Sequence, residues 1–471
     1  MPPRLVAAGL AIILMPATAY AQTAQIAAVS GRDHLALYDL ATGGELARFD
    51  APGGSSDLVA LPSGVVLSNH TGGHKLIAID LKRRAEIGRI PSSSLGGTRP
   101  VHMYLSPLLD GKQYVTVLND GEASKTKPGE RPKDSSLLLI DAVATSASFL
   151  KPVGETRLGT GHHKVSFSMK RPRFAVSNIA DCADVVSVYD YGNPADIKLV
   201  KTFAAADLGY DGSAREKTCD TTGKAGVMLS PHGTGTSAAS GRLYHFLTST
   251  GQVAIFDIDA DTPTVKIVQT SGHGGASVKD LPGGRFMVVP QRSPRELHQR
   301  AGGAPCQIGQ LAVIEAVAET VVAQVPVFYG EPACRKSLAG TPNERAALQY
   351  AMPSPDGKTL FIQVGTLYAP AGTVASASFV AVFDLSDPHR PTQLPSIAIG
   401  AGNDTRDHAL SGDGKLLLVP NSIDNTVSVI DVAARSVMRS FKTVNTPRRV
   451  VTFGDGIGPS KPVGPATLAA K

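Results

Sequence analysis

The histidines of this sequence are placed as metal ligands would be. Of the twelve, six stand at or just before the start of a short strand-forming segment: His102, His162, His163, His232, His273 and His408. Imidazole is a good ligand for zinc, copper, nickel and iron. Zinc takes three or four such ligands, often together with a carboxylate. If the fold gathers the starts of these segments around one axis, several imidazoles from distant parts of the chain can meet at one ion. The alternative is that they are polar residues lining a water-filled tunnel.

A second group of possible ligands lies in short turns. The segment SNHTGGHK places His70 and His74 on either side of a flexible Thr-Gly-Gly turn, so both rings could bind one ion. The turns VLNDG and SNIADC add Asp120 and Asp181. The remaining four histidines fit the ordinary role of a hydrogen-bonded polar residue: His34, His245, His298 and His389.

An internal repeat indicates which elements carry these residues. A short apolar alternation that ends in an acidic residue occurs eight times, as LALYD, LIAID, LLLID, VSVYD, VAIFD, LAVIE, VAVFD and VSVID. The acidic residues are separated by 41, 61, 49, 67, 58, 69 and 47 positions. Self-similarity at about 40–50 residues, with insertions, is typical of propeller blades built from four strands each. The high content of Gly (48) and Pro (33) agrees with the many tight turns of an all-β fold.

Eight repeats predict an all-β propeller of eight blades, or seven if one repeat is misassigned. The first repeat has three strand segments, QIAAVS, LALYDL and ELARFD, whereas a spare segment, RRVVTF at 448–453, follows the last repeat. We therefore expect the C-terminal strand to complete the first blade, which closes the ring and removes an open sheet edge. The propeller then occupies residues 22–453 and a flexible tail occupies 454–471. In this fold the strand-start histidines lie on the innermost strands, at one face of the central channel.

The N-terminal residues 1–21 have the features of a signal peptide. Arg4 precedes an apolar run from Leu5 to Met15, and Ala19-Tyr20-Ala21 forms a small-residue cleavage site. Pro16 ends the run before the ~20 apolar residues that a membrane span needs. No second apolar segment of that length follows. We expect a protein exported to the periplasm, with no membrane span after cleavage.

Four cysteines fit an oxidising compartment as two disulfides. None forms a C-x-x-C pair, so a thiolate metal site is disfavoured. Three pairings are possible, and we favour Cys182–Cys219 and Cys306–Cys334, because each pair then bridges neighbouring long loops around one blade.

Composition and motifs exclude several classes of protein. The 46 basic and 40 acidic residues give a net charge of +6 without a Lys/Arg run, which disfavours nucleic acid as a partner. The sequence has no Trp, which argues against propellers whose blades dock through tryptophan, and no C-x-x-C-H haem attachment site. It also lacks G-x-S-x-G, P-loop and H-E-x-x-H motifs. We therefore predict no catalytic residues and a protein that is not an enzyme.

The repeat pattern resembles the YVTN-type propeller superfamily, which includes the N-terminal domain of nitrous oxide reductase. The segments RPVH, GHHKVSFS, SPHG, GRLYHFLTSTG and GHGGAS also look like those of the AztD-type periplasmic zinc metallochaperones. That resemblance implies Zn²⁺ as cargo and, as partner, the solute-binding protein of a zinc ABC importer. It implies ligands at His102, His163, His232, His273 and His408, with His162 beside them and with His70, His74 and Asp120 in a second site. The sequence lacks the His-rich stretch of some members, and we expect a monomer.

Two other functional classes stay open. A multi-His copper enzyme like nitrous oxide reductase is disfavoured, because no cupredoxin domain with Cys, His and Met ligands follows the propeller and only 8 Met are present. A propeller without metal would serve as an interaction scaffold or as a lactonase-like hydrolase.

Overall fold

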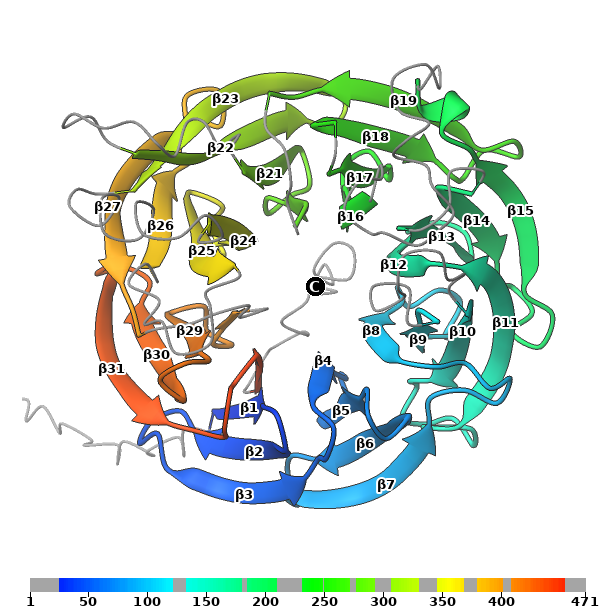
Figure 1. The fold of residues 1–471 in the computed structure, drawn as a ribbon, viewed down its shortest axis with the longest axis horizontal. Coiled ribbons are helices and arrows are strands. Elements are labelled where there is room, and N and C mark those ends of the chain that lie inside the picture. The colour runs from blue at the N-terminus through cyan, green and yellow to red at the C-terminus, as the bar shows by residue number, and fades with distance from the viewer. Residues whose placement is uncertain are drawn as a thin grey trace, which may run out of the picture.

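The strands of this protein form a closed ring of blades. The computed structural model describes residues 25–121, 133–179, 184–209, 231–248, 250–271, 277–292, 306–329, 345–367, 379–400 and 408–453. Within these residues, eight four-stranded antiparallel sheets surround a central axis (Figure 1). The helical element in these ranges is a 3-10 turn, η2 (Ala206–Leu208), and no helix there is long and apolar enough to cross a membrane. The predicted propeller is confirmed with eight blades, not seven.

Each blade runs from an innermost strand near the axis to an outermost strand at the rim. Blade 1 contains β32 (Arg449–Phe453), β1 (Ile26–Ser30), β2 (His34–Asp39) and β3 (Glu45–Asp50). Blade 2 contains β4 (Ser55–Ala60), β5 (Val65–His70), β6 (Lys75–Asp80) and β7 (Ala85–Pro91). Blade 3 contains β8 (Pro100–Leu105), β9 (Tyr114–Asn119), β10 (Asp134–Asp141) and β11 (Pro152–Thr160). Blade 4 contains β12 (His162–Phe167), β13 (Arg173–Asn178), β14 (Val186–Asp190) and β15 (Lys198–Phe203).

The second half of the ring repeats this order. Blade 5 contains β16 (Pro231–Thr236), β17 (Leu243–Leu247), β18 (Gln252–Asp257) and β19 (Thr264–Gln269). Blade 6 contains β20 (Lys279–Asp280), β21 (Phe286–Arg292), β22 (Cys306–Glu315) and β23 (Thr320–Tyr329). Blade 7 contains β24 (Arg345–Pro353), β25 (Thr359–Leu367), β26 (Phe379–Asp384) and β27 (Thr392–Ala398). Blade 8 contains β28 (Ala409–Leu410), β29 (Leu416–Asn421), β30 (Thr426–Asp431) and β31 (Ser436–Lys442).

The C-terminal strand closes the ring, as predicted. β32 pairs antiparallel with β1, from Ile26 opposite Phe453 to Ser30 opposite Arg449. Blade 1 therefore takes its innermost strand from the end of the chain and its other three from the beginning. This pairing satisfies the edge of β1 and joins the two ends of the described chain into one sheet.

The acidic residue of each repeat has a structural role, because it caps the turn into the outermost strand. Asp39 accepts hydrogen bonds from the backbone amides of Ala41 and Thr42, at 2.8 and 3.0 Å. The other seven repeats show the same contact to an amide two or three residues later. A carboxylate that binds its own backbone two residues on is the usual device of an Asx turn. The repeat thus marks where the third strand of each blade ends.

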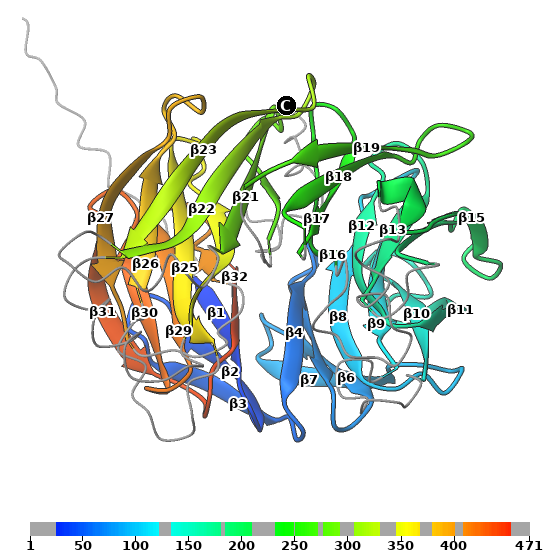
Figure 2. The ribbon, with the colours of Figure 1, turned by 45° about the horizontal axis from the view of Figure 1, so that its top comes forward.

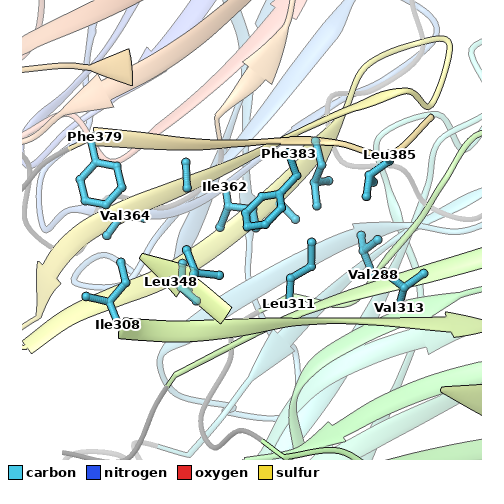
Figure 3. Packing of buried hydrophobic residues seen from close by; sticks show 14 of the residues in the cluster. Val288, Ile308, Leu311, Val313, Leu348, Ile362, Val364, Phe379, Phe383 and Leu385 are labelled. Carbon is cyan, nitrogen blue, oxygen red and sulfur yellow. The ribbon is translucent and has the colours of Figure 1, made fainter. Parts of the chain in front are cut away.

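The core lies between blades, since each sheet packs its two faces against its neighbours. Third strands are therefore buried along most of their length, whereas an outermost strand such as β31 is exposed or half-buried at every position except Phe441. Among the described residues, eight hydrophobic clusters fill the eight interfaces between adjacent blades. Figure 3 shows the cluster between blades 6 and 7, where Leu311 and Val288 face Ile362 and Phe383. A ring packed in this way holds the innermost strands in fixed relative positions.

Candidate metal centre

Four neighbouring innermost strands, β4, β8, β12 and β16, carry the candidate site (Figures 1 and 2). Near its start, each of these four strands contains a β-bulge, at which its pairing with the next strand of the blade shifts by one residue. The shifts lie between Ser55 and Asp57, Pro100 and His102, His162 and Lys164, and Pro231 and Gly233. Such bulges re-aim a side chain away from the regular alternation of a strand. His163 and His232 are themselves the extra residues of their bulges.

These bulges bring three histidine rings from blades 3, 4 and 5 together. The Nε2 atom of His163 lies 3.4 Å from Nε2 of His102 and 3.1 Å from Nε2 of His232. The His163 and His232 rings stack, whereas the His102 ring meets that of His163 edge-on. His102 and His163 are buried, and His232 is partly exposed. These three residues are called the histidine trio below. Solvent can reach the trio from the side of His232.

Buried carboxylates lie near the Nδ1 atoms of two of these histidines, and that of Asp57 is within hydrogen-bond distance. Asp57 Oδ2 lies 3.3 Å from Nδ1 of His102, and Asp120 Oδ2 lies 3.6 Å from Nδ1 of His163. A carboxylate at Nδ1 favours the tautomer with its proton there, which leaves the lone pair on Nε2. The Nε2 lone pair of His102 is then directed toward Nε2 of His163, 3.4 Å away, and a cation between the two rings would stabilise this arrangement.

Each carboxylate is in turn held by an arginine. Arg449 Nη1 of β32 lies 3.2 Å from Oδ1 of Asp57, and Arg99 Nη1 lies 3.1 Å from Oδ2 of Asp120. Both aspartates are fully buried. Asp57 also accepts a hydrogen bond from the amide of Met103 at 3.0 Å. Buried charges are stable only when they are paired and hydrogen-bonded, and both carboxylates meet this condition.

The other predicted ligands lie outside the trio. His162 is buried, with Nε2 3.0 Å from Oδ2 of Asp184. His408 is buried just before β28 in blade 8, three blades from His102. His273 and Asp181 fall outside the described residues, as do the predicted signal peptide, the C-terminal tail and the side chains that would form the two disulfides.

His70 and His74 have different environments. His70 is buried at the end of β5, and burial lowers its pKa to about 4. His74 is exposed, and its Nδ1 accepts a hydrogen bond from the amide of Arg99 at 3.4 Å. Because Arg99 also binds Asp120, His74 lies on the solvent side of the same network. A shared ion between His70 and His74 stays a prediction.

Of the histidines expected to be hydrogen-bonded polar residues, His245 has a side-chain hydrogen bond. His245 of β17 forms a 2.6 Å hydrogen bond with Ser166 of β12, and burial lowers the pKa of His245 to about 3. His34 pairs with Asp50 at 3.7 Å, and the amide of His389 donates to Asp387 in its turn. His298 lies outside the described residues. Although Ser166 and His245 are in contact, so depressed a pKa makes His245 a poor base at neutral pH.

These buried histidines predict a loss of stability in acid. Unfolded histidine titrates near pH 6.5, whereas His245 and His70 stay neutral in the fold down to about pH 3 and about pH 4. The unfolded chain therefore binds more protons between these limits, so the free energy of unfolding falls as the pH drops. Burial raises the pKa of Asp280 to about 6, which opposes this trend with a smaller shift. From His245, His70 and Asp280 together we expect a loss on the order of 3 kcal/mol between pH 6.5 and pH 4. Carboxylates whose pKa is lowered by hydrogen bonds, such as Asp184 and Glu155, act in the same direction.

Urea unfolding at several pH values, with a chelator present, measures this loss. The variant His245→Gln keeps a hydrogen-bonding group for Ser166 but does not titrate, so its stability should decline less steeply with acid. Equal slopes for the two proteins would show that His245 does not contribute.

Sequence reasoning missed Asp57, Arg99 and Arg449. In the structure, Arg449, Asp57 and His102 occupy equivalent positions of consecutive innermost strands, because each pairs with the fifth residue of the next strand in its blade. The sequence does not align them, since 23 positions separate Asp57 from Asp80 and 39 separate His102 from Asp141. Arg99 precedes β8 and has a positive φ of 59°.

Comparison with known proteins shows the fold and no family. No protein-family model matches the chain, and no curated protein matches its sequence. Dihydro-heme d1 dehydrogenase NirN, solved in complex with DHE, has a TM-score of 0.54 and 14% identity over 92% of this chain and 76% of its own. A candidate 6-phosphogluconolactonase from Bacteroides uniformis has a TM-score of 0.50 and 14% identity over 91% of this chain and 99% of its own.

Apo AztD from Citrobacter koseri is also similar, with 12% identity over 93% of this chain and 99% of its own, but its TM-score is 0.40. Such a score supports no argument about function. The solved structures thus establish that this chain is a propeller and leave its chemistry to the residues of the site.

Proposed function

We propose that the histidine trio binds Zn²⁺ and that the protein is a periplasmic zinc metallochaperone, which delivers its cargo to the solute-binding protein of a zinc importer and catalyses no reaction. The convergence of three Nε2 atoms from three consecutive blades carries this proposal. The resemblance of the histidine segments to the AztD-type proteins agrees with it.

Two of the three spacings within the trio match those of tetrahedral zinc. With Zn–N bonds of about 2.0–2.1 Å, two nitrogens of a tetrahedral site lie about 3.3 Å apart. The two Nε2–Nε2 distances of 3.4 and 3.1 Å bracket this value. Within the described ranges, no group of three or more His, Cys, Asp or Glu side chains is already arranged to hold a metal. Binding therefore requires the rings to turn so that all three nitrogens face one point.

The surroundings of the trio match those of histidines that bind metals. Such histidines usually donate their other ring nitrogen to a carboxylate or carbonyl, which fixes the tautomer and the orientation of the ring. His102 has a carboxylate at hydrogen-bond distance from that nitrogen, and His163 has one 3.6 Å away. Three protein ligands leave a fourth position of zinc open, and on the partly exposed side of His232 an incoming ligand from a partner could occupy it.

Metal analysis of the protein purified from periplasm, without added metal, tests this proposal. We expect about one zinc per chain and a colourless protein, because Zn²⁺ has a filled d shell. Stoichiometric copper with visible absorption would favour the copper enzyme instead. Protein that holds no metal, and takes up none when zinc is added, would contradict the proposal.

A further inference from the structure

The strand that closes the ring also reaches the histidine trio. Arg449 of β32 is almost completely buried, and its guanidinium lies 3.2 Å from Asp57 of β4. The other oxygen of Asp57 lies 3.3 Å from Nδ1 of His102 on β8. An unbroken chain of charged and polar contacts therefore runs across blades 1, 2 and 3, from the last strand of the propeller to the first histidine of the trio.

β32 closes the ring by pairing the end of the chain with its beginning, and this junction is called the seam below. β32 stands at the end of its sheet and its one ladder within the sheet is with β1. Besides the Arg449–Asp57 pair, Val450 packs into the interface with blade 8, Val451 packs into that with blade 2, and the Thr452 hydroxyl donates to the carbonyl of Leu410 in blade 8. In a closed propeller, this junction between the two ends of the chain is where the ring can open without breaking a continuous blade. Anything that fixes β32 against blade 2 therefore stabilises closure.

We infer that Arg449 is a positioning residue that couples closure of the ring to zinc binding. This inference rests on the proposed function. With the seam closed, Arg449 neutralises Asp57, and Asp57 holds His102 with Nε2 directed toward His163. With the seam open, Asp57 would lose its buried counter-ion, and a buried unpaired carboxylate is strongly unfavourable. Coupling between two equilibria is reciprocal, so zinc bound at the trio must stabilise the closed seam to the same extent that closure favours zinc.

The wild-type protein gives the first test. Amide hydrogen exchange of β32 and β1 is compared with and without one equivalent of Zn²⁺. We expect zinc to slow exchange in these two strands, although neither contributes a ligand. If the protein binds zinc while exchange in β32 and β1 is unchanged, the inference is wrong and the proposed function stands; if it binds no zinc, the proposed function itself fails.

The variant Arg449→Met gives the second test. Loss of a residue that orients a metal ligand typically lowers metal affinity 10–100-fold. We expect a loss in this range, together with loss of the zinc effect on exchange in β32. Arg449→Lys keeps the positive charge, so it should retain an intermediate affinity, and it serves as the test if the methionine variant does not fold.

A matched control is Arg173→Met. Arg173 is also mostly buried and links two blades, pairing with Asp190 at 3.4 Å and donating to the carbonyls of Ile258 and Ala260. It is not part of the network around the trio. Its replacement should lower stability and leave zinc affinity unchanged. Equal zinc affinity in Arg449→Met and wild type, or an equal loss in Arg173→Met, would overturn the inference.

Discussion

Replacing both His163 and His232 with alanine is expected to lower zinc affinity by about four orders of magnitude or more. Apparent binding free energies of zinc sites are about 10–16 kcal/mol, so each of four ligands accounts for about 2.5–4 kcal/mol, or two to three decades in Kd. His163 should be the more important of the two, because its Nε2 contacts both other rings. Competition against a chelator of known zinc affinity measures the change.

The matched control removes two histidines elsewhere. His34 and His389 lie in blades 1 and 7, and His389 is exposed. The double variant His34→Ala, His389→Ala should bind zinc as the wild type does. Both double variants should keep the circular dichroism of a β protein, since the blade interfaces do not depend on these side chains. Wild-type affinity in the His163, His232 variant would exclude the trio as the zinc site.

Much of the fold could be predicted from the sequence, because its signals are local. The apolar alternation and its terminal carboxylate are needed in every blade, since the alternation fills an interface and the carboxylate caps a turn. The incomplete first repeat and the spare strand at 448–453 predicted how the ring closes, and β32 confirms it. The apolar alternation and its terminal carboxylate occur in every blade, so a single sequence displays them eight times.

The geometry of the site could be predicted only in part. The positions of His102, His163 and His232 at strand starts indicated that they lie near the axis, and the structure brings them together. The bulges near the starts of these strands depend on pairing with the next strand, which the sequence pattern does not show. The roles of Asp57 and Arg449 depend on contacts across blade boundaries, and their residue types did not repeat the histidine pattern. The repeated histidines therefore allowed the trio to be predicted from the sequence, whereas Asp57 and Arg449, which support His102, could not be.

Direct transfer of zinc to a docked partner is the second large effect that we expect. A tight site releases metal slowly into water, so useful delivery requires ligand exchange while the two proteins are in contact. The partly exposed His232 and the exposed His74, which contacts the backbone of Arg99, lie where an incoming ligand could approach. Transfer should therefore be faster than spontaneous release and should accelerate with the concentration of the partner.

The variant His74→Ala separates exchange from storage. His74 is exposed and lies outside the trio. Its removal should slow transfer and leave zinc affinity close to that of the wild type. The variant with alanine at positions 163 and 232 should carry no zinc to transfer at the same protein concentration.

The most direct measurement mixes the zinc-loaded protein with the apo solute-binding protein of a zinc importer and follows the metal, with and without a competing chelator. We expect zinc to reach the partner in the presence of the chelator, at a rate that rises with partner concentration and exceeds the rate of unassisted release. Capture of all the zinc by the chelator, at the unassisted rate, would contradict direct delivery and would make the protein a zinc store.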